Sequence, residues 1–180
     1  AAPAAPAAPD GTRWLVAALL ASLAGDVALM FDGFFVAGLA AFLCAHLAYG
    51  VLLARAVRRP PRAAVVASMA AVGAGFFVFL WTNGLPPGLR GPVAAYVVAI
   101  CAMAALAIEH ALATRSRAAT LVAAGAVLFV VSDALLATDR FVGALPYARA
   151  WVLSTYYAAQ LLIASNVLRA GPGRPATSAR

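Results

Sequence analysis

Six long apolar segments dominate this sequence and limit the folds open to it. A helix that crosses the hydrocarbon core of a bilayer needs roughly 20 mostly apolar residues, and each segment is long enough. Each is also bounded by proline, glycine or charged residues, which end helices. We therefore predict six membrane-spanning helices, at residues 13–31, 34–57, 62–82, 92–112, 117–138 and 147–169.

The composition agrees with a membrane protein. Of the 180 residues, 65% are hydrophobic and 11% are charged, whereas soluble domains carry about 25% charged residues. Too few polar side chains are present to cover a water-soluble fold. We expect an all-α, polytopic transmembrane bundle at residues 13–169, with disordered tails at 1–12, which is rich in alanine and proline, and at 170–180.

The positive charge indicates topology. The net charge is +7, and every basic residue is an arginine. Arginines concentrate in alternate connections, so the positive-inside rule places both termini in the cytoplasm. We expect the membrane to be a bacterial-type plasma membrane. Because the arginines lie between apolar segments, we expect no nucleic-acid partner. The arginines of the predicted inner side are Arg13, Arg55, Arg58, Arg59, Arg62, Arg115, Arg117, Arg169, Arg174 and Arg180.

Two aspartates lie inside predicted spans. An ionisable side chain at that depth costs roughly 2.5–3.5 kcal/mol on insertion scales, so it normally faces a cavity or a partner. Asp26 and Asp133 lie near the outer ends of two spans that run in the same direction. Their similar depth allows both carboxyls to share one cavity. The alternative is that each carboxyl only caps a helix or bonds a neighbouring hydroxyl.

Other polar residues accompany the aspartates. Phe42, His46 and Tyr49 follow one another at helical spacing and so share a face. Tyr156 and Gln160 share a face near the middle of the last span, where an amide needs partners. A buried histidine can also be a satisfied core group, and tyrosine near an interface commonly anchors a helix.

Further polar residues lie nearer the predicted interfaces. Asp32 and Asp139 fall in predicted connections, and we expect both to be solvated. Glu109 and His110 lie beside Arg115 and Arg117, where we expect an interfacial charge cluster.

Small residues and cysteines carry less functional information. Ala21/Gly25 and Ala71/Gly75 recur at four-residue spacing, which lets transmembrane helices approach closely. Cys44 and Cys101 lie in apolar segments without metal-ligand spacing, so we interpret them as buried small hydrophobic residues. The sequence contains no phosphate-binding loop, zinc-protease motif or serine-hydrolase elbow. We predict no metal and no cofactor.

Several short motifs resemble the YhhN/TMEM86 family of membrane lysoplasmalogenases. The first is the SxxGDxxLM pattern at Ser22 to Met30, and the others follow in the family's order between Leu19 and Ser165. Family members usually have eight spans, and this sequence contains counterparts of six. The other matching residues are Phe35, Gly38, Phe42, His46, Tyr49, Pro92, Tyr96, Met103, Gly125, Ala126, Phe129, Ser132, Asp133, Leu136, Arg140, Phe141, Tyr156, Gln160, Leu162 and Ile163.

The resemblance implies hydrolysis of the vinyl-ether bond of a lysoplasmalogen, a lipid drawn from the bilayer, to a fatty aldehyde and a glycerophospho-base. Asp26 and Asp133 would then be the catalytic acid and base, because a carboxyl removed from water favours its neutral, proton-donating form. Which aspartate has which role stays open. The substrate-binding residues would be Ser22, His46, Tyr49, Tyr96, Ser132, Tyr156 and Gln160, with Arg140 at the phosphate and Arg149 and Arg90 as secondary candidates.

Two other functions remain possible at this point. Intramembrane carboxyls and a histidine also form proton relays, so the chain could be a small proton-coupled carrier. The polar residues could instead join helices in a non-catalytic scaffold. The sequence does not indicate the oligomeric state.

Overall fold

The computed structural model describes residues 9–57 and 59–170, and this part of the chain folds into helices without any β-strand. The predicted all-α class is confirmed. The helices are α1 (Pro9–Leu29), α2 (Phe35–Ala56), α3 (Ala63–Asn83), the short 3-10 helix η1 (Pro87–Leu89), α4 (Arg90–Thr114), α5 (Arg117–Phe141) and α6 (Ala148–Asn166).

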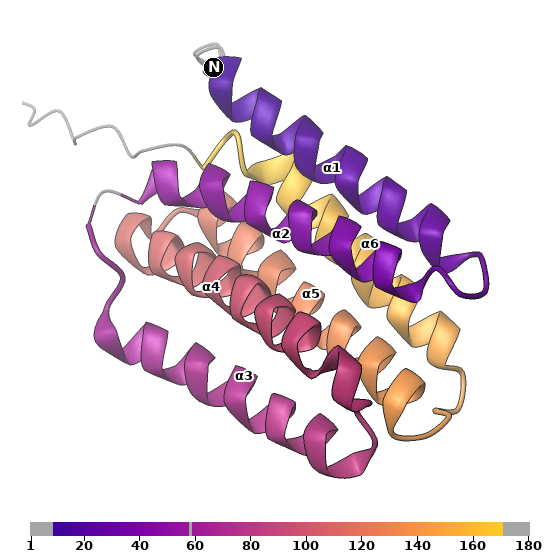
Figure 1. Cartoon of the computed structure of the whole chain (residues 1–180). Helices are drawn as coiled ribbons and strands as arrows, with labels where there is room; N and C mark the ends of the chain where they lie inside the picture. The colour runs from indigo at the N-terminus through magenta and orange to yellow at the C-terminus, as the bar shows by residue number, and fades with distance from the viewer. Residues whose placement is uncertain (1–8, 58, 171–180) are drawn as a thin grey trace, which may run out of the picture.

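Five of the six described α-helices, α1 to α5, are long and apolar enough to cross a membrane. The chain is therefore an integral membrane protein. Six spans were predicted, and α6 is the exception. Its arginine, glutamine and asparagine side chains interrupt the apolar residues. It nevertheless packs along α5 (Figure 1).

The helix ends differ slightly from the prediction. Helix α1 begins at Pro9, inside the predicted tail at 1–12, and α5 continues to Phe141, past the predicted end at 138. The remainder of the two predicted tails, residues 1–8 and 171–180, lies outside the described residues, as does residue 58.

Each described helix packs mainly against one to three others. Helix α1 packs on α2, α2 on α4, α4 on α5 and α5 on α6. Helix α3 packs on α4 at the periphery of the bundle (Figure 1). The core lies between α2, α4, α5 and α6. Its largest fully buried side chains include Tyr49, Phe129 and Met103. Helix α3 contributes few buried residues and leaves most of its apolar side chains at the surface.

Two glycines allow the close helix packing that positions the polar residues. A Cβ at Gly25 of α1 would lie 2.6 Å from the Phe42 ring of α2. A Cβ at Gly125 of α5 would lie 3.0 Å from the Ala159 carbonyl of α6. The predicted packing role of Gly75 is wrong, because nothing lies within 4 Å of its Cβ position. Gly73 packs instead, since the buried side of α3 follows Val65, Gly73 and Leu80.

The C-terminal end of α4 is buried, in contrast to the predicted interfacial cluster. Glu109 is 5% exposed, and it accepts a hydrogen bond from the Arg62 backbone N–H at 3.1 Å. The Arg62 side chain lies 3.7 Å from the same carboxylate. His110 Nε2 donates to the Ala170 carbonyl. These contacts join α4 to the α2–α3 connection and to the segment that follows α6.

Candidate functional site

Asp133 lies on α5 at the meeting point of side chains from α2 and α4. The Tyr96 hydroxyl donates to Asp133 Oδ2 at 2.5 Å, and His46 Nε2 lies 3.2 Å from the same oxygen. His46 Nε2 also lies 2.9 Å from the Tyr96 hydroxyl oxygen. Since the tyrosine proton goes to Asp133, His46 must carry its own proton on Nε2 to bond either oxygen. One carboxylate oxygen is therefore held by two donors.

The Asp26 carboxyl ends a chain of hydrogen bonds that crosses from α2 through α6 to α1. The Tyr49 hydroxyl donates to Gln160 Oε1 at 2.5 Å, and Gln160 Nε2 donates to the Tyr156 hydroxyl at 3.1 Å. The Tyr156 hydroxyl donates in turn to Asp26 Oδ2 at 2.8 Å. Every donor points toward Asp26. This arrangement satisfies the amide and two phenols inside an apolar bundle, where each unpaired group would be costly.

The Phe129 ring lies between the two hydrogen-bonded groups. Its centroid is 5.2 Å from that of His46, 5.7 Å from Tyr156 and 6.0 Å from Tyr49. These separations fall in the range that aromatic pairs prefer. The fully buried Phe129 side chain thus fixes the rings that hold Asp133 and those that hold Asp26.

Both aspartates line a single cavity of about 690 Å³ between α1, α5 and α6, which we name the two-aspartate cavity. The similar depth of Asp26 and Asp133 in their predicted spans had indicated that they could share a cavity. The cavity is also lined by two charged residues near the α5–α6 connection, Asp139 and Arg149. Its lining is Asp26, Leu29, Met30, Phe42, Ser132, Asp133, Leu136, Asp139, Ala148, Arg149, Val152, Leu153, Tyr156 and Tyr157.

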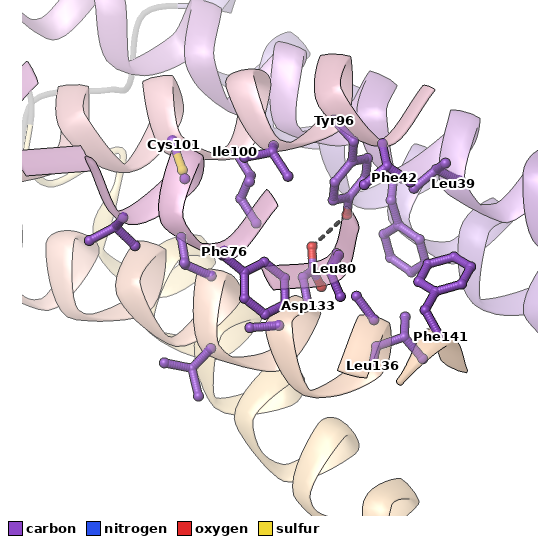
Figure 2. Close-up of a pocket in the computed structure, with 18 of the residues that line it drawn as sticks. Leu39, Phe42, Phe76, Leu80, Tyr96, Ile100, Cys101, Asp133, Leu136 and Phe141 are labelled. Carbon is purple, nitrogen blue, oxygen red and sulfur yellow. Dashed lines mark hydrogen bonds between the residues drawn. The ribbon is translucent and has the colours of Figure 1, made fainter. Parts of the chain in front are cut away.

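A second cavity, of about 270 Å³, lies on the other side of Asp133 between α2, α3, α4 and α5. Apart from Asp133 and the Tyr96 hydroxyl, its lining is apolar, and we name it the apolar cavity. Figure 2 shows Asp133 near its middle, with Cys101 toward one end and Phe141 toward the other. The residues that line both cavities are Leu29, Phe42, Asp133 and Leu136.

The predicted site residues divide by position. Ser132, Tyr96 and Tyr156 line one of the two cavities, and the Ser132 hydroxyl also donates to the Val152 carbonyl at 3.1 Å. His46, Tyr49 and Gln160 line neither cavity. His46 contacts Asp133 and Gln160 contacts Tyr156, whereas Tyr49 is joined to the cavity only through Gln160. Ser22 is fully buried beside the Tyr156 hydroxyl. Arg140 belongs to neither cavity lining, and its guanidinium lies 5.2 Å from the ring centroid of Phe35, which lines the apolar cavity.

Sequence reasoning missed one charged residue of the two-aspartate cavity and ranked another too low. Asp139 was predicted to be solvated in a connection, but it lies on α5 and lines the cavity, where its Oδ1 accepts the Leu145 backbone N–H at 2.8 Å. The spacing of Ser132, Leu136 and Asp139 would have placed it on the cavity face had the helix been extended to residue 141. Arg149 was considered only as a secondary phosphate ligand, yet it lines the cavity that Arg140 does not reach.

The arrangement suits acid and base chemistry. Two carboxyls face one cavity, and each has one oxygen fixed by donors. Within residues 9–57 and 59–170, no group of three or more histidine, cysteine, aspartate or glutamate side chains is placed to hold a metal ion.

Known proteins resemble the chain over most of its length. It is 36% identical over 158 residues to human "Lysoplasmalogenase TMEM86B", which covers 88% of this chain and 65% of the human protein. It is 38% identical over 161 residues to "Lysoplasmalogenase" of Mycobacterium bovis, covering 86% and 60%. The rat "Lysoplasmalogenase TMEM86B" is 38% identical over 168 residues, covering 92% and 66%.

The chain thus spans less than two thirds of the length of the human and mycobacterial relatives. No solved structure matches it. The YhhN family profile matches residues 1–167, nearly the whole chain. With relatives at this level of identity and a profile match of this length, the chain belongs to the YhhN family.

Proposed function

We propose that the protein is a membrane hydrolase that cleaves the vinyl-ether bond of lysoplasmalogens, giving a fatty aldehyde and a glycerophospho-base. One observation carries the proposal. Asp133 lies in the wall shared by a cavity that is apolar and a cavity that holds a second aspartate and an arginine. When a lysolipid places its hydrocarbon chain in the apolar cavity and its polar part in the two-aspartate cavity, the bond between chain and glycerol lies at Asp133. The names of the relatives agree with this chemistry.

Asp133 is the proton donor in this mechanism. A vinyl ether opens when a proton adds to the alkenyl carbon that bears the hydrocarbon chain, which leaves an oxocarbenium ion at the carbon attached to oxygen. Asp133 adjoins the apolar cavity, so it faces the chain-bearing carbon. Tyr96 and His46 hold Oδ2 as the acceptor oxygen, which leaves Oδ1 to carry the proton. The electron pair of the double bond takes that proton.

Asp26 activates the water in the second step. Its carboxylate lies in the two-aspartate cavity, oriented by Tyr156, and takes a proton as water attacks the oxocarbenium carbon. The product is a hemiacetal. Asp26 then returns its proton to the glycerol oxygen while Asp133 takes the hemiacetal hydroxyl proton, the carbon–oxygen bond to glycerol breaks, and aldehyde and alcohol leave. Both carboxyls return to their starting forms, as in paired-carboxylate glycosidases.

The outer end of the two-aspartate cavity suits a zwitterionic headgroup. Arg149 is the cation of the cavity lining, and a guanidinium binds phosphate oxygens in a fixed geometry. Asp139 supplies an anion on the same lining for a choline or ethanolamine ammonium. We therefore assign the phosphate to Arg149 in preference to Arg140, whose guanidinium packs on Phe35.

Replacing either aspartate tests the proposal. We expect Asp26→Asn and Asp133→Asn each to lower aldehyde release from alkenyl glycerophosphocholine by about 100-fold or more, the usual effect of removing a positioned acid or base. Purified protein in nanodiscs, with aldehyde measured by mass spectrometry, gives the rates. Asp32→Asn is the matched control, because Asp32 is exposed in the α1–α2 connection and should keep parental activity.

Parental rates in both cavity variants would refute the catalytic assignment. Proton flux that depends on an added solute, measured in proteoliposomes without aldehyde formation, would instead indicate a proton-coupled carrier. That alternative draws support from the directed chain of hydrogen bonds that ends at Asp26. A scaffold predicts loss of stability in the variants and no turnover by the parent.

A further inference from the structure

The apolar cavity has a narrow point where α3 approaches α4. There α3 carries Gly73, and a Cβ at this position would lie 2.9 Å from Cys101 Sγ and 3.0 Å from Val97 Cγ1. Both neighbours belong to the cavity lining. Contacts this short leave no room for a side chain without displacement of a neighbour. The absence of a side chain at residue 73 therefore keeps this part of the cavity open.

The narrow point lies on the inner side of Asp133. Tyr96, which bonds Asp133, and Cys101, which contacts the Gly73 position, are five residues apart on α4, a rise of about 7.5 Å. Helix α4 runs from its outer end at Arg90 toward the predicted inner side. A chain that extends from Asp133 toward the bilayer midplane passes Gly73 at this depth. Figure 2 shows Ile100, Cys101 and Phe76 around this part of the cavity.

The cavity reaches the surface of the bundle on the same side. Val72 of α3 and Val131 of α5 line it, and they are 49% and 41% exposed. Helix α3 packs mainly on α4 and touches α5 only lightly. A long chain can thus continue past Gly73 into the bilayer between α3 and α5. The cavity volume, about 270 Å³, is at the lower limit of typical ligand pockets and suits one chain rather than two.

From these contacts we infer that the apolar cavity binds the single hydrocarbon chain of a lysolipid, and that Gly73 determines how long a chain the site accepts. This inference rests on the proposed function for its substrate. It adds a specificity-determining residue that lies outside the polar network. A short chain ends before Gly73, while a long one must pass it.

A pair of matched glycine variants on α3 tests the inference. Gly73→Leu should lower turnover of a hexadecenyl lysolipid by about tenfold or more, as a misfitting group does in an apolar pocket. Turnover of a hexenyl lysolipid should stay within about twofold, because that chain ends before the narrow point. Gly75→Leu adds the same side chain to the same helix where the space is open, and it should leave both rates unchanged.

Chain binding is measured separately through the Cys101 thiol, which requires neither turnover nor a variant at Gly73. Cys101 is buried as predicted, whereas the prediction that Cys44 is buried is wrong, because it is exposed. Cys44→Ala leaves Cys101 as the sole cysteine. In nanodiscs, methyl methanethiosulfonate should modify Cys101 in the absence of lysolipid. Hexadecyl glycerophosphocholine, an ether that lacks the vinyl bond, should slow the modification several-fold. Its hexyl counterpart should not, and intact-protein mass spectrometry follows the reaction.

The outcomes separate the two proposals. If the parent hydrolyses no vinyl-ether lipid, the proposed function fails and Cys101 protection alone decides whether a chain occupies the cavity. If the parent is active but the long ether leaves Cys101 unprotected, chain binding in this cavity is wrong. Equal ratios of long-chain to short-chain turnover in the Gly73→Leu and Gly75→Leu proteins would exclude Gly73 as the determinant. If Gly73→Leu does not fold, the smaller Gly73→Ala change, with Gly75→Ala as its control, gives the same ratio.

Discussion

At the scale of single residues, the Tyr96 hydroxyl provides the shortest hydrogen bond to Asp133, at 2.5 Å. Tyr96→Phe removes this donor and keeps the ring. A hydrogen bond to a charged group is worth about 1.5–3 kcal/mol, so we expect the turnover number for the vinyl-ether lipid to fall by roughly 10-fold to 100-fold. The Michaelis constant should change little, because the hydroxyl holds the carboxyl and not the lipid.

Tyr147→Phe is the control for this change. Tyr147 is 82% exposed at the start of α6, and the loss of its hydroxyl should leave the kinetics unchanged. Tyr147→Phe should unfold at the parental temperature and Tyr96→Phe below it, because a buried hydrogen bond is lost, so the rates are compared at a temperature where both proteins are folded. If Tyr96→Phe retains the parental turnover number, the hydroxyl does not position Asp133 for catalysis.

Tyr49 allows a separate test of stability. Its hydroxyl donates to Gln160 at 2.5 Å, and the side chain is fully buried. Tyr49→Phe leaves the Gln160 oxygen without this donor, which should cost about 1–3 kcal/mol of unfolding free energy. Detergent-titrated unfolding measures the change. A parental unfolding midpoint would show that the amide finds another donor.

Much of the site could be predicted because polar residues are rare in these spans. Asp26, Asp133, His46 and Gln160 stand out against an apolar background, and their cost inside a bilayer marks them. Arg149 and Asp139 could not be separated from ordinary interfacial charges in the same way. Residues of this kind occur near the ends of most spans, and only the packing of α5 against α6 places these two on the cavity.

At the scale of helices, Gly125 permits the contact of α5 with α6. A Cβ there would lie 2.8 Å from Ile163 Cγ1 and 3.0 Å from the Ala159 carbonyl, and the backbone carbonyl cannot move aside alone. Gly125→Ala should therefore lower the unfolding free energy by about 1–3 kcal/mol, as overpacking does. Activity should also fall, since α6 carries Tyr156 and Gln160.

Gly50→Ala is the matched control on α2. It lies mid-helix with nothing within 4 Å of its Cβ position, so alanine should be neutral or slightly stabilising. Unfolding curves of both variants in one detergent compare them directly. Equal unfolding midpoints for Gly125→Ala and Gly50→Ala would show that α5 and α6 accommodate the added methyl group at little cost in unfolding free energy.

The helices themselves were predictable, whereas their facing sides were only partly so. Long apolar segments predict the existence of α1 to α5 without knowledge of any neighbour. The four-residue spacing of small residues selected Gly75 on α3, which follows Ala71, and missed Gly73, which follows Met69. The buried side of α3 is set instead by where α4 lies. The apolar cavity was likewise invisible in sequence, because its lining consists of ordinary leucine, valine and phenylalanine.

At the scale of the whole molecule, the arginine distribution yields a prediction about orientation. Arg55, Arg59, Arg62, Arg115 and Arg117 lie in the connections after α2 and α4 or at the helix ends beside them, so we place these connections and both termini in the cytoplasm. Single cysteines added to a Cys44→Ala/Cys101→Ala protein report the orientation. Gly143→Cys, in the α5–α6 connection, should react with a membrane-impermeant maleimide in intact cells, and Arg59→Cys should react only after permeabilisation.

This orientation decides which leaflet supplies the lipid. Asp139 and Arg149 lie at the end of the bundle that holds the α5–α6 connection, and the two-aspartate cavity contains both. The headgroup site therefore faces the outer leaflet if Gly143→Cys is labelled from outside. In that case, lysoplasmalogen added to the outside of oriented vesicles should be cleaved at once, while lipid confined to the inner leaflet should be cleaved only as fast as it crosses. The reverse labelling pattern would move the headgroup site to the cytoplasmic face and reverse this preference.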